Sequence, residues 1–138
     1  GHLVLATLHT NDAPSAVTRL TDMGVEPFLL SSSLLGVLAQ RLVRKLCPHC
    51  KRADERGRYH PVGCEACGKT GYKGRMAVFE LMATGPRLRH LIQTGKSATE
   101  LAQAAMEEGN LKLMRQDGIL KVLAGLTSIE ELARVVTI

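Results

Sequence analysis

Aromatic residues are scarce in this chain of 138 residues, which has two Tyr, two Phe and no Trp. The hydrophobic fraction is nevertheless 45%, so a core has to be built mainly from aliphatic side chains and Met. Long apolar runs are absent as well: the longest apolar-rich stretch, residues 28–39, contains three consecutive serines and is too short to cross a bilayer. We therefore expect one ordinary domain or two small ones, with no transmembrane helix.

The first residues also lack the features of a secretory signal. Residues 1–5 contain no Lys or Arg, and no typical cleavage site follows them. They are typical instead of the middle of a buried strand. The simplest explanation is that the chain is part of a longer protein.

Positive charge is concentrated in one segment. The net charge of the chain is +5, but residues 41–75 contain ten Lys or Arg against three acids, so this segment alone carries +7. Such a segment favours an anionic partner, for which nucleotide phosphates, nucleic acid and lipid headgroups are all candidates.

Apolar periodicity predicts a mixed α/β chain. We expect strands over residues 3–8, 38–46 and 76–82, and helices over residues 13–23 and 27–35. If the second and third strands pair, residues 47–75 form the tip of a long hairpin. After residue 83 every segment is predicted to be helical, in a C-terminal cluster of four short helices. Ser97 and Glu100 form a capping box at the start of the second of these.

Four cysteines form two Cys-x-x-Cys pairs, separated by thirteen residues. This spacing is typical of a closed tetrahedral zinc site, in which the metal has a structural role because no coordination position is left open. Disulfides and a redox pair are the alternatives, and they are disfavoured by the missing secretory signal. His49 and His60 are possible substitute ligands. The predicted ligands are Cys47, Cys50, Cys64 and Cys67.

A phosphate-loop pattern overlaps the second cysteine pair. Residues 63–70 match G-x-x-x-x-G-K-T in every letter. A phosphate loop needs a buried strand before it and a helix after it, because the backbone N–H groups must converge on the phosphate. Neither flank has that pattern, and Cys64 and Cys67 are predicted metal ligands. We therefore expect no phosphate loop here, nor at Gly95, where the preceding glycine of the pattern is missing.

His9 and the basic turn after the second cysteine pair each allow two interpretations. His9 follows a predicted buried strand, at the edge of an α/β sheet where ligands gather, but it could simply cap a turn. Residues 71–75, which end in Arg75, are compatible with an anion site or with a solvated turn.

Several long stretches resemble one family, the secretion ATPases of type II secretion and type IV pilus systems. Residues 1–12 resemble the family's histidine box, and residues 38–48, the second cysteine pair and residues 71–75 resemble its metal-binding module. Residues 114–118 resemble its C-terminal helical region. The resemblance covers essentially the whole chain and is strongest to the type II secretion traffic ATPases.

The resemblance implies the C-terminal part of a RecA-like motor. It divides the chain into residues 1–46 of the ATPase core, a zinc lobe at 47–75 and a closing strand with helices at 76–138. It further implies a cytoplasmic homo-hexamer, peripheral to the inner membrane through its platform proteins, that drives pseudopilus assembly with ATP and Mg²⁺. His9 would be a catalytic residue near the γ-phosphate, and Arg75, with Arg41 as a second candidate, would bind nucleotide.

The resemblance also implies what these residues do not contain. The family's phosphate loop, acidic box and Mg²⁺-binding acid would lie before Gly1, so the isolated chain should neither bind ATP tightly nor hydrolyse it. The insert between the cysteine pairs is shorter than in many type II members. A type IV pilus ATPase is the alternative, as is a zinc-ribbon nucleic-acid-binding module. The shortage of aromatic residues for base stacking disfavours the module, so no nucleic-acid partner is expected.

Overall fold

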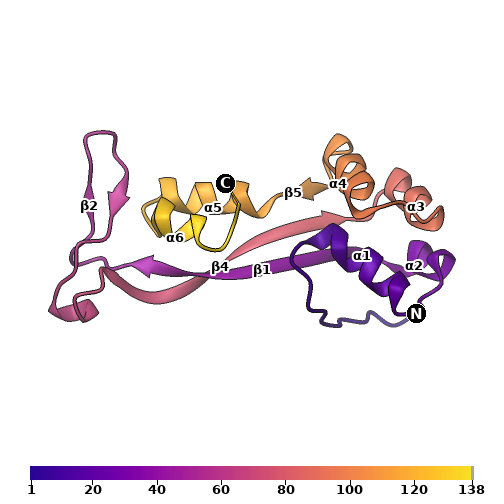
Figure 1. Cartoon of the computed structure of the whole chain (residues 1–138), viewed down its shortest axis with the longest axis horizontal. Coiled ribbons are helices and arrows are strands. Elements are labelled where there is room, and N and C mark those ends of the chain that lie inside the picture. The colour runs from indigo at the N-terminus through magenta and orange to yellow at the C-terminus, as the bar shows by residue number, and fades with distance from the viewer. Residues whose placement is uncertain (138) are drawn as a thin grey trace. The chain divides into compact units, whose positions relative to one another are not determined.

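The computed structural model describes residues 1–137. The chain folds into two compact units. The first combines residues 1–39 with residues 80–112, and the second combines residues 40–79 with the described residues from 113 onward. Figure 1 shows helices and strands in both, which confirms the α/β class.

The first unit contains four helices: α1 (Ala13–Asp22), α2 (Pro27–Ser33), α3 (Pro86–Gln93) and α4 (Ala98–Glu107). Helix α3 packs against α2 and α4, and α4 also packs against α1. The predicted capping box at the start of α4 is present, with Ser97 and Glu100 each accepting a backbone N–H of the other residue. The core of this unit is largely aliphatic, and its fully buried side chains include Val17, Met82, Leu88, Ile92 and Leu101.

The strand predicted over residues 3–8 does not form. Residues 1–10 have no regular secondary structure, and Leu3, Val4 and Leu5 are exposed. The prediction was wrong because a strand is stable only when it pairs with another strand, and within the described chain no strand pairs with this segment.

Two long strands, β1 (Gly36–Leu46) and β4 (Tyr72–Ala83), are hydrogen-bonded neighbours and run in opposite directions, which confirms the predicted hairpin (Figure 1). A short third strand, β5 (Leu111–Lys112), pairs antiparallel with β4 through Leu81 and Met82. This corrects the prediction that everything beyond residue 83 is helical. The helix expected from Leu111 begins at Met114 instead.

Over its described residues, the second unit contains the segment rich in Cys and two further helices. Between β1 and β4 lie a two-residue ribbon of β2 (Arg52–Ala53) with β3 (Tyr59–His60), and a 3₁₀ turn, η1 (Glu65–Cys67). Helix α5 (Met114–Leu123) packs against α6 (Ile129–Ala133), which Ser128 caps. Across the described chain, no helix is long and apolar enough to span a membrane.

The loop between α5 and α6 is bonded to the end of β1. The N–H of Leu46 donates to the carbonyl of Leu126 at 2.9 Å, and the hydroxyl of Thr127 donates to the carbonyl of Arg44 at 2.8 Å. Thr127 is fully buried, so its hydroxyl needs this partner. These bonds fix the end of β1, from which the cysteine segment begins.

Candidate metal centre

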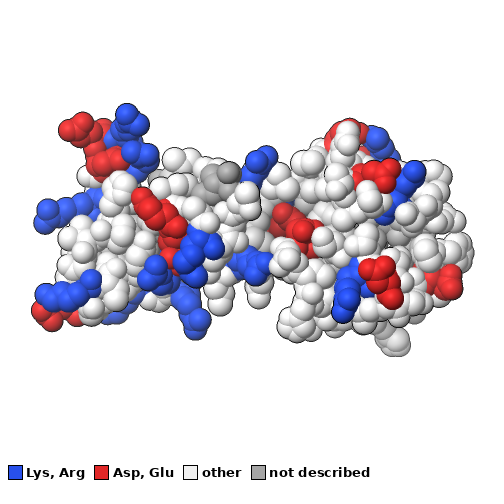
Figure 2. Space-filling model, viewed as in Figure 1, with Lys and Arg blue, Asp and Glu red and all other residues white. Residues whose placement is uncertain are grey.

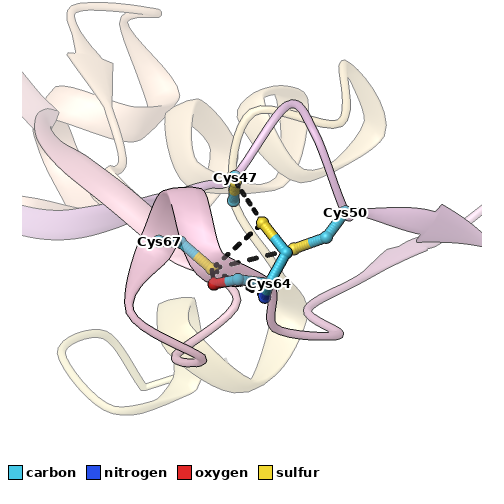
Figure 3. Close-up of side chains that lie close together, drawn as sticks. All are labelled: Cys47, Cys50, Cys64 and Cys67. Carbon is cyan, nitrogen blue, oxygen red and sulfur yellow. Dashed lines mark hydrogen bonds between the residues drawn. The ribbon is translucent and has the colours of Figure 1, made fainter.

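Two turns bring the four cysteines together. Cys47 follows the last residue of β1, and its N–H donates to the carbonyl of Gly71 at 2.9 Å. The chain then turns so that the N–H of Cys50 donates to the carbonyl of Cys47, and the N–H of Cys67 makes the same bond to Cys64 across η1. Figure 3 shows the four side chains directed at one another.

The distances between the sulfur atoms fit a single tetrahedral metal ion. All four Sγ atoms lie within 4.8 Å of one another, with Cys47–Cys64 and Cys50–Cys67 at 3.9 Å and Cys64–Cys67 at 3.8 Å. Four sulfurs at the usual Zn–S bond length of about 2.3 Å are separated by about 3.8 Å along each edge of the tetrahedron. The cysteines are therefore placed to hold a metal ion.

Backbone N–H groups around the cluster favour the thiolate form of its sulfurs. Gly63 donates to Sγ of Cys50, and Cys64 and Gly71 both donate to Sγ of Cys67, each at 3.2 Å. Burial raises the pKa of the Cys67 thiol, but the two backbone donors, with the neighbouring thiols, outweigh it and lower the pKa to about 6. A thiolate is the form that binds a metal.

The two histidines considered as substitute ligands lie outside the cluster. His60 Nε2 is 3.1 Å from a carboxylate oxygen of Asp54, and its Nδ1 is 3.8 Å from Glu130. His49 is exposed in the first turn. Among the described residues, the group placed to hold a metal contains cysteines alone.

The phosphate-loop pattern at residues 63–70 is confirmed as coincidental. Its interior is the 3₁₀ turn η1, the chain continues into strand β4 rather than a helix, and two of its N–H groups donate to cysteine sulfur. None of these features presents a row of backbone donors to a phosphate.

The other predicted site residues are divided between the two units. His9 is exposed in the irregular segment of the first unit, ahead of α1. Arg41 is half-buried on β1 and Arg75 is exposed on β4, both in the second unit. Their grouping around a nucleotide stays a prediction.

Arg75 borders an open hollow in the second unit. The other residues lining it are Arg44, Thr70, Tyr72 and Gly74. The Arg44 guanidinium stacks on the Tyr72 ring at 4.2 Å and forms a salt bridge to Glu131 at 2.7 Å. Figure 2 shows Lys and Arg side chains, with fewer acids among them, over the part of the molecule that contains β2. Because the Arg44 guanidinium already donates to Glu131, Arg75 is the residue of this hollow whose guanidinium is a candidate donor for an anion.

Sequence reasoning missed two carboxylates that organise these units. Glu131 is buried and accepts hydrogen bonds from the side chains of Arg44 and Arg134 and from the N–H of Arg44. Glu80 is buried in the first unit and accepts the N–H of Ala13. The available signal for Glu80 was its position in an apolar strand, where the alternation predicts a hydrophobic residue.

Comparison with known sequences places the chain in a family. The sequence model described as "Type II/IV secretion system protein" matches residues 1–134. The chain belongs to this family. The resemblance stated from the sequence is thereby confirmed.

Members of the type II/IV secretion system family with similar sequences include proteins of both systems. Type II secretion system protein HxcR of Pseudomonas aeruginosa is 56% identical over 135 residues, which cover 98% of this chain and 28% of that protein. Type II secretion system protein E of Dickeya dadantii is 51% identical over 98% of this chain and 30% of that protein. The type IV pilus assembly ATPase PilB of Thermus thermophilus is 50% identical over 99% of this chain and 17% of that protein. The chain thus spans less than a third of these relatives.

The matches differ in length. The match with PilB extends over 155 residues, more than the 138 of this chain. PilB therefore has additional residues within the matched region. The match with HxcR extends over 135 residues and needs no such addition.

Among solved structures, the pilus retraction motor PilT with bound ADP is similar in fold. The TM-score is 0.67 at 24% sequence identity, over the whole of this chain and 33% of that one. At this identity the likeness concerns the fold.

Proposed function

We propose that this chain is the C-terminal part of a cytoplasmic ATPase that powers type II protein secretion by driving pseudopilus assembly, in the manner of a general secretory pathway protein E. The observation that carries the proposal is the 56% identity with HxcR across 98% of the chain. The catalytic fold would be RecA-like, which is consistent with the likeness to PilT.

In this proposal His9 acts beside the γ-phosphate during ATP hydrolysis. Arg75 and, secondarily, Arg41 contribute guanidinium groups to nucleotide binding, and the position of Arg75 beside an open hollow supports this role. The phosphate loop and the acid that binds Mg²⁺ would belong to residues outside this sequence. The 138 residues alone should therefore show no ATP hydrolysis.

Zinc is the proposed occupant of the cysteine cluster. A set of four thiolates with tetrahedral spacing matches the ligand preference and geometry of Zn²⁺. When bound, the ion supplies a cross-link between the two Cys-x-x-Cys turns and leaves no coordination position for chemistry. The domain division at residues 46 and 75 stays a prediction.

The assembly proposed for the full-length protein is a homo-hexamer. It would be peripheral to the inner membrane and held there by the platform proteins of the secretion system, with the zinc lobe touching a neighbouring subunit or that platform. No nucleic-acid partner is proposed.

A type IV pilus assembly ATPase is the second candidate, because PilB shares 50% identity with the chain. Exchanging the matched segment separates the two. In one chimaera this chain replaces its counterpart in HxcR, and in a second it replaces its counterpart in PilB. We expect the first to hydrolyse ATP and restore secretion in cells lacking HxcR, and the second not to restore pili.

Restored pili without restored secretion would favour the pilus alternative. Two chimaeras that bind metal normally but do not hydrolyse ATP would contradict the proposal as a whole. Metal content serves as the folding control, because it depends on the cysteine turns and not on nucleotide.

A further inference from the structure

Glu80 lies at a position of β4 where the alternation of buried and exposed residues predicts an apolar side chain. On β4 the buried residues alternate, with Val78, Glu80 and Met82 on the same face. Glu80 is only 6% exposed. A buried carboxylate is unfavourable unless hydrogen bonds compensate for its lost hydration, so its presence calls for a specific partner.

One such partner is the beginning of α1. The N–H of Ala13, the first residue of the helix, donates to Oε1 of Glu80 at 2.8 Å. Ala13 is fully buried, so water cannot take the place of the carboxylate. The next residue, Pro14, has no N–H, and the N–H of Ser15 donates to Oδ1 of Asp12 at 2.8 Å. Glu80 and Asp12 thus satisfy the first donors of α1 between them.

Only a short, partly bonded stretch of chain joins the start of α1 to His9. Asp12 caps α1, and its carbonyl accepts the hydroxyl of Thr10 at 3.2 Å. Three residues separate His9 from Ala13, so an anchor at Ala13 restricts the directions that the His9 backbone can take. Glu80 is the one member of this set that comes from β4, 67 positions along the chain from Ala13.

We propose that Glu80 is a positioning residue for ATP hydrolysis: it anchors the start of α1 and thereby orients His9. This inference rests on the proposed function, in which His9 acts at the γ-phosphate. Because Glu80 would act on the orientation of His9 and not on nucleotide affinity, its loss should lower kcat and leave KM for ATP nearly unchanged.

A matched control lies in the same unit. Glu108 accepts the N–H of Arg87, near the start of α3, at 3.1 Å, so it satisfies a helix N-terminus from another element just as Glu80 does. No histidine-box segment precedes α3. The bond from Arg87 is more exposed than the bond from Ala13, so Glu108 variants report the effect of a lost helix-start acceptor that does not lead to His9.

The test is a double-mutant cycle in the full-length ATPase. Glu80→Met keeps the length of the side chain and removes the acceptor, whereas Glu80→Gln keeps one carbonyl oxygen. We expect His9→Ala and Glu80→Met each to lower kcat at least tenfold, on the order of the loss when a catalytic group is misplaced. Their double mutant should be no slower than the slower single mutant, within about threefold, since a side chain that is absent cannot be misplaced. Glu80→Gln should retain more kcat than Glu80→Met.

The control cycle uses Glu108→Met with His9→Ala, whose effects on kcat should multiply. Multiplying effects of Glu80→Met and His9→Ala would overturn the inference while leaving the role of His9 intact. An unchanged kcat in His9→Ala would overturn both that role and the inference. If Glu80→Met does not fold, the cycle is measured with Glu80→Gln, and multiplying effects there overturn the inference equally.

Discussion

Among single residues, Glu131 is a buried carboxylate that pairs with two arginines of the second unit. Its side chain is fully buried, with guanidinium nitrogens of Arg44 and Arg134 at 2.7 Å and 2.9 Å from its carboxylate oxygens. Burial raises the pKa of this carboxyl, but the hydrogen bonds from both arginines and from the N–H of Arg44 outweigh it and lower the pKa to about 2. The ionised form is therefore the one that stabilises the folded chain.

We expect the ionisation of Glu131 to make the free energy of unfolding decrease at acidic pH. Since its pKa is lower in the folded chain than the ordinary 4.5, the unfolded chain binds the proton first as pH falls. The stabilisation is complete above about pH 5 and is lost as pH falls towards 2. Glu131→Gln should lower the free energy of unfolding by about 2 kcal/mol at pH 7, the scale of a charged hydrogen bond.

Urea denaturation between pH 7 and pH 2 measures this prediction as the difference between wild type and Glu131→Gln, which should shrink with falling pH. The control is Glu130→Gln, at the neighbouring position, where the side chain is 60% exposed. A difference in unfolding free energy that stays constant from pH 7 to pH 2 would contradict this prediction. It would mean that the pKa of Glu131 is the same in the folded and unfolded chains.

A second residue-level prediction concerns Gly71. Its φ is +77°, and a Cβ there would lie 2.5 Å from Cβ of Pro61. Its N–H donates to Sγ of Cys67, and its carbonyl accepts from Cys47. Gly71→Ala should therefore displace both bonds and weaken zinc binding by roughly tenfold or more, as lost outer-shell partners do. Competition with a chromogenic chelator measures the affinity.

Gly68→Ala is the matched control for Gly71. Gly68 has a similar φ of +62°, but nothing lies within 4 Å of the added Cβ. Both variants share the cost of a left-handed alanine, about 1 kcal/mol, so the difference between them isolates the contact with Pro61. Equal zinc affinities for the two variants would show that Gly71 is required for backbone conformation alone.

Among the elements, the two cysteine turns should lose far more local stability when the metal is removed than the helices of the first unit. Outside β2 and β3, residues 47–71 have few backbone hydrogen bonds of regular structure. Chelation should therefore speed amide hydrogen exchange across these residues and leave α3 and α4 unchanged. Mass spectrometry of exchange before and after chelation checks this, together with metal analysis, which should return one ion per chain.

Histidine variants separate the cysteine cluster from a mixed ligand set. His49→Ala and His60→Ala should both retain the full metal content, because neither imidazole belongs to the cluster and His60 is bonded to Asp54. Cys50→Ala should lose the metal. A loss of metal in either histidine variant would show that an imidazole completes the site.

The elements that could be predicted from the sequence are those whose signals are local. Asp12, Ser97 and Ser128 cap helices from within the same few residues, and all three caps are present. The cysteine cluster was predictable for a similar reason, because each Cys-x-x-Cys pair is itself one turn and only two such turns had to meet.

The features that could not be predicted depend on partners distant in the chain. Residues 3–8 have the composition of a strand, but composition does not provide a pairing partner. Strand β5 is two residues long and forms because Leu111 and Lys112 pair with β4. No local sequence pattern predicts this pairing. Glu131 and Glu80 find their partners 87 and 67 positions away.

For the whole molecule, the decisive prediction concerns Arg75 in the full-length ATPase. If Arg75 stabilises phosphate charge as proposed, Arg75→Ala should lower ATP hydrolysis at least tenfold, because the guanidinium is removed. Metal content should be unchanged, since Arg75 is not part of the cysteine cluster. Lys73→Ala, an exposed cation two residues earlier on the same strand, is the control. Equal activities of the two variants would remove Arg75 from the nucleotide site.

A metal ion held by the four cysteines would join both ends of residues 51–63, and this has a consequence for where the protein tolerates foreign sequence. Doubling the length of a flexible segment raises its closure cost by only about 0.6 kcal/mol, far below the roughly 10 kcal/mol that a structural zinc site contributes. The exposed turn at Glu55, Arg56 and Gly57 is therefore a natural graft point. An epitope or fluorophore introduced there should make the protein visible in cells without loss of metal binding by the cysteines.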